Sequence, residues 1–420
     1  MNILMVLIFV SGYIAIALEN KLKVNKAAMA LLVAVFCWGF NFIENFPPDE
    51  ASLHNLIEHL GEISQVIFFL MGAMTIVELI DSHGGFKIIT DFIMTRDKRK
   101  LLWAISIFTF FLSSVLDNLT TSIVMVSLLR RLIPDRDDRM IFASMVIIAA
   151  NAGGAWSPIG DVTTTMLWIG GQVTAGKLMK LLIIPSLVSL LIPLLYCSLS
   201  IKQGTYPDSS HSTDSPAQHG AKRVFFLGIG SLIFVPIFRA VTNLPPFMGV
   251  FLGLGIMWVL TDLIHQKRDH LKVPMILTRI DFSSILFFLG ILLAVAALET
   301  AGILGSLALR MDNYFYNKDI IATVLGLLSA VIDNVPLTAA TMGMYPLSSF
   351  PADSKLWEMI AYCVGTGGSI LIIGSAAGVV VMGMEKISFG WYLKKISLPV
   401  LIGYLLGIGF FLMIYHVIYG

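Results

Sequence analysis

An Asp-Asn pair occurs twice in this chain, each time in strongly apolar surroundings. Asp117-Asn118 interrupts one apolar stretch, and Asp333-Asn334 interrupts another in the second half of the chain. A carboxylate in an apolar environment is costly, and a membrane protein that keeps one usually uses it. We therefore expect the two copies to be two halves of one functional site.

The composition is that of a polytopic membrane protein. Of the 420 residues, 57% are hydrophobic and 13% are charged, whereas about 25% are charged in an average soluble domain. We expect membrane lipid to surround the chain, and the net charge of +1 argues against a nucleic-acid partner. The three cysteines lie scattered in apolar segments without CxxC spacing, so we interpret them as small apolar residues.

Apolar runs predict an all-α fold with ten membrane-spanning helices, five in each half. They are residues 3–18, 27–43, 63–81, 140–169, 178–199, 224–241, 246–264, 281–300, 356–385 and 391–418. Two pairs of shorter runs flank the Asp-Asn pairs: 101–115 with 119–133, and 319–332 with 335–349. A run of about 15 residues makes about 22 Å of helix, too short for a hydrocarbon core of about 30 Å. Each short pair therefore predicts a re-entrant helical hairpin with its Asp-Asn turn near the middle of the membrane.

Landmarks of the first half recur in order in the second half, about 215 residues later. Pro185, for example, matches Pro399. We predict two repeats, residues 1–199 and 224–420, joined by a cytoplasmic linker at 200–223 that is polar and rich in Ser, Pro and Gly. Because each repeat has an odd number of spans, the second must be inverted relative to the first.

Basic residues predict the orientation of the spans. Lys21, Lys23 and Lys26 follow the first span, and Arg and Lys residues flank both ends of the first hairpin. The loop between the second and third spans is acidic instead. We therefore predict that the first hairpin opens to the cytoplasm, that the second opens to the outside and that both termini are external.

Glycine and proline cluster inside two of the predicted spans. Gly153, Gly154, Pro158 and Gly160 fall within one of them, and a Gly-Thr-Gly-Gly-Ser run from Gly365 falls within its counterpart. Proline removes an amide donor and glycine weakens a helix, so we expect both spans to be broken. Unwound backbone exposes carbonyl oxygens that can coordinate a cation.

Inverted repeats with broken helices are typical of secondary transporters, whose site lies at the repeat interface. Here this interface supplies the carboxylate, carbonyl and hydroxyl oxygens that a hard cation such as Na⁺ prefers. Candidate cation- and proton-binding residues are Asp117, Asn118, Thr120, Thr121, Asn151, Ser157, Asp161, Asp333, Asn334, Thr338, Thr366, Ser369 and Ser375, with Thr163 to Thr165 as further hydroxyls. The first half is richer in ligands, so we expect Asp117 and Asp161 to bind Na⁺, with Asp333 as the weaker candidate. Neither motif holds Arg, Lys or His, so an anionic substrate would lack a counter-charge.

Other charged residues in apolar runs have simpler interpretations. Arg239, near the end of its span, is expected to snorkel to the membrane surface. Glu385, at the end of the second broken span, is expected to pair with Lys386 or with water. Three acidic residues are weighed as a proton relay against a plain role as solvated helix ends: Glu78, Asp81 and Glu299.

At these motifs the chain resembles the ion-transporter superfamily and, within it, the NhaD-type sodium/proton antiporters. The resemblance covers nearly the whole chain and rests on the two Asp-Asn turns, the segment from Ala149 to Asp161 and the glycine run from Gly365. It implies a homodimer in the bacterial inner membrane that works as an elevator. The scaffold would comprise residues 1–95 with 224–310, and the transport part 96–199 with 311–420. In dicarboxylate-transporting members the tips carry a Ser-Asn-Thr pattern, which Asp-Asn replaces here.

The favoured hypothesis is a secondary active transporter that exchanges Na⁺, or Li⁺, for H⁺. A buried carboxylate can hold either a proton or a metal ion, so competition for one such group would couple the two ions. The alternative is an arsenite or small-carboxylate transporter of the same superfamily. An enzyme is disfavoured, because the sequence has no HExxH or GxSxG motif and pairs no Ser with His in these motifs. We expect no cofactor.

Overall fold

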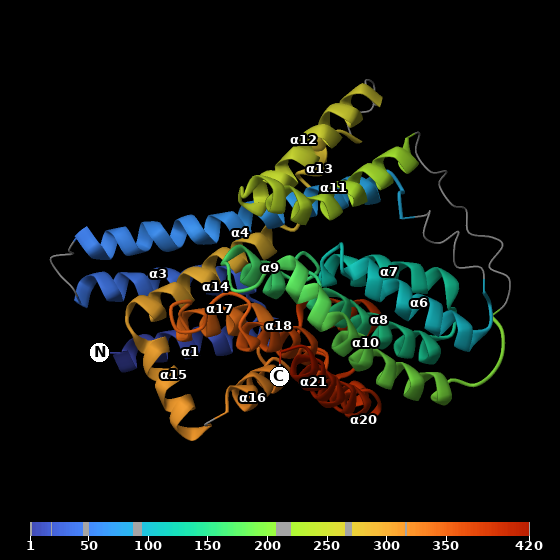
Figure 1. Cartoon of the computed structure of the whole chain (residues 1–420). Coiled ribbons are helices and arrows are strands. Elements are labelled where there is room, and N and C mark those ends of the chain that lie inside the picture. The colour runs from blue at the N-terminus through green and yellow to red at the C-terminus, as the bar shows by residue number, and fades with distance from the viewer. Residues whose placement is uncertain are drawn as a thin grey trace.

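The computed structural model in Figure 1 describes residues 2–17, 19–44, 50–86, 95–206, 220–264, 271–315 and 317–419. Within these ranges every regular element is a helix, apart from one bridge between Asp97 and Thr205. The prediction of an all-α protein is therefore confirmed. The middle of the predicted linker, residues 207–219, lies outside the described residues.

The first repeat runs from α1 to α10. Its helices are α1 (Asn2–Ala17), α2 (Glu19–Leu22), α3 (Lys26–Glu44), α4 (Glu50–Ser82), α6 (Lys98–Ser113), α7 (Asn118–Leu132), α8 (Arg136–Ala155), α9 (Val162–Ile169) and α10 (Ala175–Ser200). The pair α6–α7 is the expected hairpin, and α8 and α9 are the two parts of the expected broken span.

The second repeat has the same order. Its helices are α11 (Ala221–Thr242), α12 (Pro246–Ile264), α13 (Val273–Ile276), α14 (Phe282–Thr300), α15 (Ile303–Tyr314), α16 (Lys318–Leu328), α17 (Asn334–Met344), α18 (Lys355–Gly367), α19 (Ala376–Glu385), α20 (Phe389–Lys395) and α21 (Ser397–Tyr419). Here α16–α17 is the hairpin and α18–α19 the broken span. The chain thus folds as two inverted repeats of five spans, each with a re-entrant hairpin.

Seven described helices are long and apolar enough to cross a membrane: α3, α4, α10, α11, α12, α14 and α21. The shorter α1 and the two broken spans complete five spans in each repeat. Besides the one-turn helices α2 and α13, hydropathy missed two longer helical stretches. The helix α4 begins at Glu50, because Glu, Leu, Ala and His continue it beyond the apolar run. The helix α15 was not predicted at all, since its charged and apolar residues alternate around one short helix.

The two repeats interlock along their helices (Figure 1). The helix α3 packs along α14, α10 packs along α21, and α4 packs on α12. Small residues allow this close approach: a side chain at Gly290 would collide with the backbone of Ala30, and one at Gly403 with the carbonyl of Ser189. Such contacts are how helices associate in lipid, where apolar burial alone provides little drive.

Two charged residues have partners other than those expected. Glu385, 4% exposed, accepts hydrogen bonds from Arg130 Nε at 2.6 Å and from Arg139 Nε at 2.7 Å, instead of pairing with Lys386 or water. Arg239 donates to the carbonyl of Trp168 at 2.5 Å and lies over the Trp168 ring. Both sets of contacts join segments far apart in sequence, which hydropathy cannot pair.

The Glu385 cluster predicts a stability effect. Glu385→Gln leaves two guanidinium groups without a carboxylate, so we expect a loss of about 2–3 kcal/mol in the free energy of unfolding. The loss is smaller than for a fully buried pair because the Arg130 side chain is 47% exposed. Thermal unfolding in detergent measures it. Lys386→Gln is the matched control and should leave the transition unchanged; equal losses in both variants would contradict the assigned pairing.

Candidate functional site

The aspartate of each hairpin tip begins the second helix of its hairpin. Asp117 is the N-cap of α7, and its carboxylate accepts from Thr120 N at 2.8 Å and Thr120 Oγ1 at 2.5 Å. Asp333 is the N-cap of α17 and accepts from Val335 N at 3.1 Å. Aspartate caps well because its oxygens bind amide groups that the helix leaves unpaired. Each of these carboxylates therefore has a structural role as well as an exposed edge on a cavity described below.

The two tip asparagines converge on one carboxylate, that of Asp161. Asn118 Nδ2 donates to Asp161 Oδ1 at 3.3 Å, and Asn334 Nδ2 donates to Asp161 Oδ2 at 3.0 Å. Thr163 Oγ1 adds a third hydrogen bond, to Oδ2 at 2.8 Å. Asp161 is 1% exposed and stands where the broken span resumes as α9. Asp161 is thus the point where both inverted hairpins and a broken helix meet.

Asn151 of α8 extends this network to the second broken helix. It accepts from Asn118 Nδ2 at 2.9 Å, and its own Nδ2 donates to Ser369 Oγ at 2.8 Å and Ser375 Oγ at 3.0 Å. Its counterpart in the second repeat is Gly365, which has no side chain. The network of hydrogen bonds around Asn151 therefore has no mirror image in the second repeat.

A small cavity of about 50 Å³ lies beside these residues. Its polar lining comes from Asp117, Asn118, Asp161, Thr165, Ser284, Asp333 and Asn334. About 10–15 Å³ of such space is enough to hold one water molecule, so the cavity has room for a small ion. Among the described residues, no Arg, Lys or His contributes to its wall.

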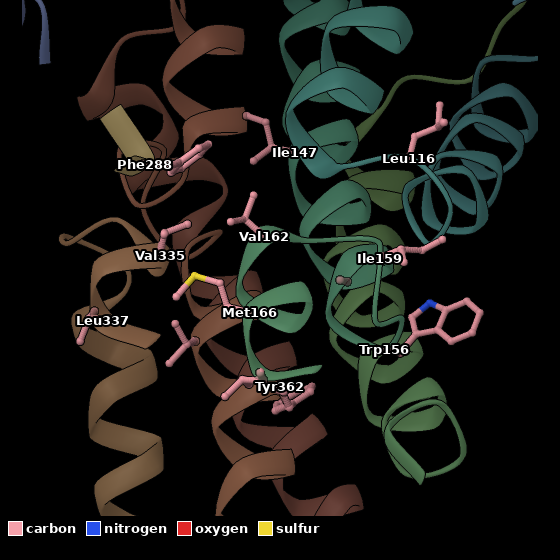
Figure 2. Packing of buried hydrophobic residues seen from close by; sticks show 14 of the residues in the cluster. Leu116, Ile147, Trp156, Ile159, Val162, Met166, Phe288, Val335, Leu337 and Tyr362 are labelled. Atoms are coloured by element: carbon pink, nitrogen blue, oxygen red, sulfur yellow. The ribbon is translucent and has the colours of Figure 1, made fainter. Parts of the chain in front are cut away.

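Apolar side chains form the rest of the cavity lining, and Figure 2 labels several of them. Leu116 and Ile159 lie on the side of the first hairpin, Val335 on the side of the second, and Val162 between them. Phe288 of α14 closes a further side. An apolar enclosure strengthens every electrostatic interaction inside it, because water is excluded.

The remaining candidate hydroxyls mostly bind backbone carbonyls. Ser157 donates to Ser114 O at 2.5 Å, Thr366 to Tyr362 O at 2.6 Å and Thr338 to Asn334 O at 3.0 Å. Ser375 accepts from Gly378 N as the N-cap of α19, and the Thr121 hydroxyl is buried without a hydrogen bond among the described residues. Most of these groups hold the broken segments in place, and their hydroxyl hydrogens do not face the cavity.

The three candidates for a proton relay do not line this cavity. Glu78 accepts from Ser82 at 3.2 Å, and Glu299 lines a separate cavity of about 420 Å³ together with His59 and Glu62. Asp81, on the last turn of α4, is absent from the linings of both cavities.

Two polar groups near the tips come from helices that carry neither an Asp-Asn pair nor a glycine cluster. Ser284 of α14 lines the cavity, and Tyr13 of α1 accepts a hydrogen bond from the backbone amide of Asp333 at 3.0 Å. Both lie in apolar spans without glycine clusters. Their only signal in the sequence is that they are polar residues in otherwise apolar helices.

The paired glycines serve close packing more than unwinding. Gly153 and Gly154 lie inside α8, and the helix breaks only at Trp156. A methyl group at Gly153 would overlap the Phe110 carbonyl of the first hairpin. In the second repeat, Gly367 meets the carbonyl of Gly326 in the same way. The expectation that these glycines unwind the helix is therefore wrong for Gly153 and Gly154.

Fold and site together define a class: an integral membrane secondary transporter with inverted repeats, of the ion-transporter superfamily. The family model described as CitMHS, citrate transporter, matches residues 13–360. A crystal structure of the Alcanivorax borkumensis YdaH transporter, titled as revealing an unusual topology, shares the fold with a TM-score of 0.58. It covers 87% of this chain and 89% of that one at 12% identity.

Sequence relatives are more specific. Sodium/proton antiporter 2 of Arabidopsis thaliana is 50% identical over 98% of this chain and 99% of its own length. The Na⁺/H⁺ antiporter NhaD of Vibrio cholerae is 30% identical over 98% of this chain and 91% of its own. The Na⁺/H⁺ antiporter NhaD of Alkalimonas amylolytica is 31% identical over 92% of this chain and 84% of its own length. The chain belongs to the CitMHS family and, within it, to the NhaD-type sodium/proton antiporters; these relatives are transporters, and the chain is not an enzyme.

The close packing of the first hairpin on α8 predicts a stability effect. Gly153→Ala places a methyl group against the Phe110 carbonyl, so we expect a loss of about 1–3 kcal/mol in unfolding free energy. Gly176→Ala in α10 is the matched control, because nothing lies within 4 Å of its added methyl. Detergent-melting curves compare the two. A Gly153→Ala protein as stable as the control would disprove the close contact.

Proposed function

We propose that this protein exchanges Na⁺, or Li⁺, for H⁺ across the membrane, with Asp161 as the central ion-binding group. One observation carries the proposal. The Asp161 carboxylate receives an asparagine from each hairpin tip at 3.3 and 3.0 Å, beside a cavity with two further aspartates. The names of the antiporter relatives support it.

A single buried carboxylate explains why the two ions would exchange. Removing an ionised carboxylate from water is costly unless a cation or a proton neutralises it. A proton and Na⁺ both neutralise Asp161, but they compete for the same oxygens. Binding of one therefore requires release of the other, which is the simplest physical basis for antiport.

The two asparagines would change roles as the ions alternate. In the present arrangement Asn118 and Asn334 turn their N–H groups toward Asp161. A carboxamide carries a donor and an acceptor on one carbon, so turning it over presents an oxygen where the nitrogen was. We propose that Na⁺ at Asp161 selects this turned orientation and gains two oxygen ligands.

The other two aspartates would support Asp161. Both oxygens of Asp117 already accept hydrogen bonds from Thr120. For this reason we propose Asp161, and not Asp117, as the main ligand of the ion. Asp333 lines the same cavity with one oxygen bound to Val335. We propose that both raise the negative potential of the cavity and supply remaining ligands.

The proposed motion is that of an elevator. The hairpins, the broken helices, α10 and α21 pack on one another and would form the transport part. The first three spans of each repeat also pack together and would form the scaffold: α1, α3, α4, α11, α12 and α14. The cavity lies where α4 and α14 meet the tips, so sliding of one part past the other would change the side from which it is reached. The homodimer, external termini and a bacterial inner-membrane location complete the proposal.

A small carboxylate or arsenite is the alternative substrate, and the description of the family model as a citrate transporter favours the former. The cavity argues against an anion. Three aspartates and no basic residue line it among the described residues, so a carboxylate substrate would meet like charge.

Transport in proteoliposomes with an internal pH dye tests the proposal. We expect Na⁺ to evoke a pH change in the wild-type protein, and Asp161→Asn to reduce it at least about tenfold, since the amide can neither release a proton nor neutralise Na⁺. Asp262→Asn, which changes an exposed carboxylate of α12, is the matched control and should transport normally.

Two outcomes would contradict the proposal. Normal exchange by Asp161→Asn would mean that another residue is the central ligand; Asp117→Asn and Asp333→Asn, measured alongside, identify it. Absence of any Na⁺- or Li⁺-evoked pH change in the wild-type protein, with uptake of labelled citrate or arsenite, would establish the alternative.

A further inference from the structure

Another buried carboxylate, Glu358, lies in the transport part but away from both the ion site and the Glu385 cluster. It stands in the first turn of α18 and is 0% exposed. Neither of its carboxylate oxygens has a hydrogen-bond partner among the described residues. Thr366, the nearest ion-site candidate on the same helix, is eight residues further on, or about 12 Å along the axis. Glu358 therefore belongs to neither the proposed ion site nor its network.

The nearest cation, Lys177, makes its hydrogen bond to another residue. Lys177 Nζ of α10 is 3.8 Å from Glu358 Oε1. The same ammonium donates to the backbone carbonyl of Asp353 at 2.6 Å and lies 4.5 Å from the centre of the Tyr419 ring. At 3.8 Å it makes no hydrogen bond to Glu358. The lysine is thus placed to move between two acceptors.

Other charged groups around α18 are already paired. Lys355, on α18 itself, binds Asp319 of α16 at 2.6 Å. The helices α9 and α17 contribute no charged side chain within their bounds. The helix α21 contributes Tyr415 and Tyr419, whose rings lie beside Lys177, and His416, which is exposed. At the far end of α8, Arg139 binds Glu385. Glu358 therefore faces one mobile cation, Lys177, and one anion, Asp353.

Two arrangements of these groups satisfy their charges. A buried carboxylate without a hydrogen bond is strongly disfavoured when ionised, so with Lys177 on Asp353 the neutral, protonated form of Glu358 is stable. When the proton leaves to water, Lys177 must move toward Glu358 to pair with it. That movement removes Lys177 from the Asp353 carbonyl.

Asp353 is a joint between the two broken spans. Its carboxylate accepts from Thr174 N at 2.6 Å and Thr174 Oγ1 at 2.8 Å, which caps the start of α10. Its amide donates to the carbonyl of Gln172 at 2.7 Å. Its φ of +61° is a strained, left-handed value for a residue other than glycine, which surrounding contacts must hold. Loss of the Lys177 contact would loosen the joint between the turn after α9 and the loop before α18.

We propose that Glu358 is a regulatory proton-binding site, separate from the transported ions, that releases this joint when it loses its proton. Protonated Glu358 leaves Lys177 on Asp353 and holds the ends of the two broken spans together, which slows transport. Ionised Glu358 takes Lys177 and frees them, so transport speeds up as pH rises. This inference rests on the proposed function for its effect on rate, but the proton site itself does not.

The first test is the pH profile of exchange in proteoliposomes. Glu358→Gln resembles the protonated form in shape and charge, so we expect it to fold and to keep the slow rate of the acidic range at alkaline pH, at least about fivefold below wild type. The Na⁺ concentration for half-maximal rate should not change, because the ion site is intact. Lys177→Met should lose the slowing of the acidic range and stay fast across the profile, because no ammonium then holds the Asp353 carbonyl at any pH. Lys180→Met, an exposed lysine of the same helix, is the matched control.

The second test does not depend on transport. Infrared difference spectroscopy of the purified protein in detergent should show the C=O band of a protonated carboxyl that disappears as pH rises. The band should be missing in Glu358→Gln and should persist in Asp161→Asn, whose transport is expected to fail. A band that titrates in a protein without Na⁺ exchange would support the proton site and reject the proposed function alone.

The opposite results overturn the inference. A Glu358→Gln protein with the wild-type pH profile and an unchanged infrared band would mean that Glu358 is a permanently ionised partner of Lys177. If Glu358→Gln does not fold, the profile of Lys177→Met against Lys180→Met decides, and equal profiles reject the switch.

Discussion

The rest of the site depends on one buried carboxylate. Asp161 is almost wholly shielded from solvent, and an ionised group there is tolerable only with hydrogen bonds to both oxygens. The asparagines at the two hairpin tips provide them, one from each repeat. Since those tips approach from opposite sides, satisfying Asp161 requires both inverted repeats to be folded and docked. The free-energy cost of burying Asp161 is therefore met only in the folded arrangement of both repeats.

Close backbone packing makes this convergence possible. The hairpin α6–α7 lies on α8, and α16 lies on α18, with glycines where their backbones meet. Ser113 binds the carbonyl of Ala150 and Ser329 that of Val364, so each hairpin is fastened to its broken span in the same way. Charged groups then join the outer parts of the assembly: Glu385 holds two arginines of the first repeat, and Asp353 caps α10 from the second. Packing sets the distances, and polar contacts select the pairs.

The relation between sequence and structure differs between the fold and the site. Apolar run lengths predicted the spans, the hairpins and the breaks, because the bilayer thickness sets those lengths. The helix α15 was not predicted from these runs, since its residues are mixed in polarity. The Asp-Asn pairs lie at the two hairpin tips, as the short apolar runs predicted. The preference for Asp117 came from the larger number of ligand residues in the first repeat, and it stays a prediction. The contacts place the asparagines, more than their neighbouring aspartates, against Asp161.

By itself the sequence determined that this is a helical membrane protein of two related halves with carboxylates kept in apolar surroundings, because hydropathy, repeat spacing and the cost of buried charge are properties of the chain alone. Only the tertiary structure decided which of these groups meet. Asn334 reaches Asp161, Arg130 reaches Glu385, and Lys177 stands between Glu358 and Asp353. The residues of each pair lie in segments that are far apart in the chain. Their partners follow from how helices pack, which no local pattern encodes.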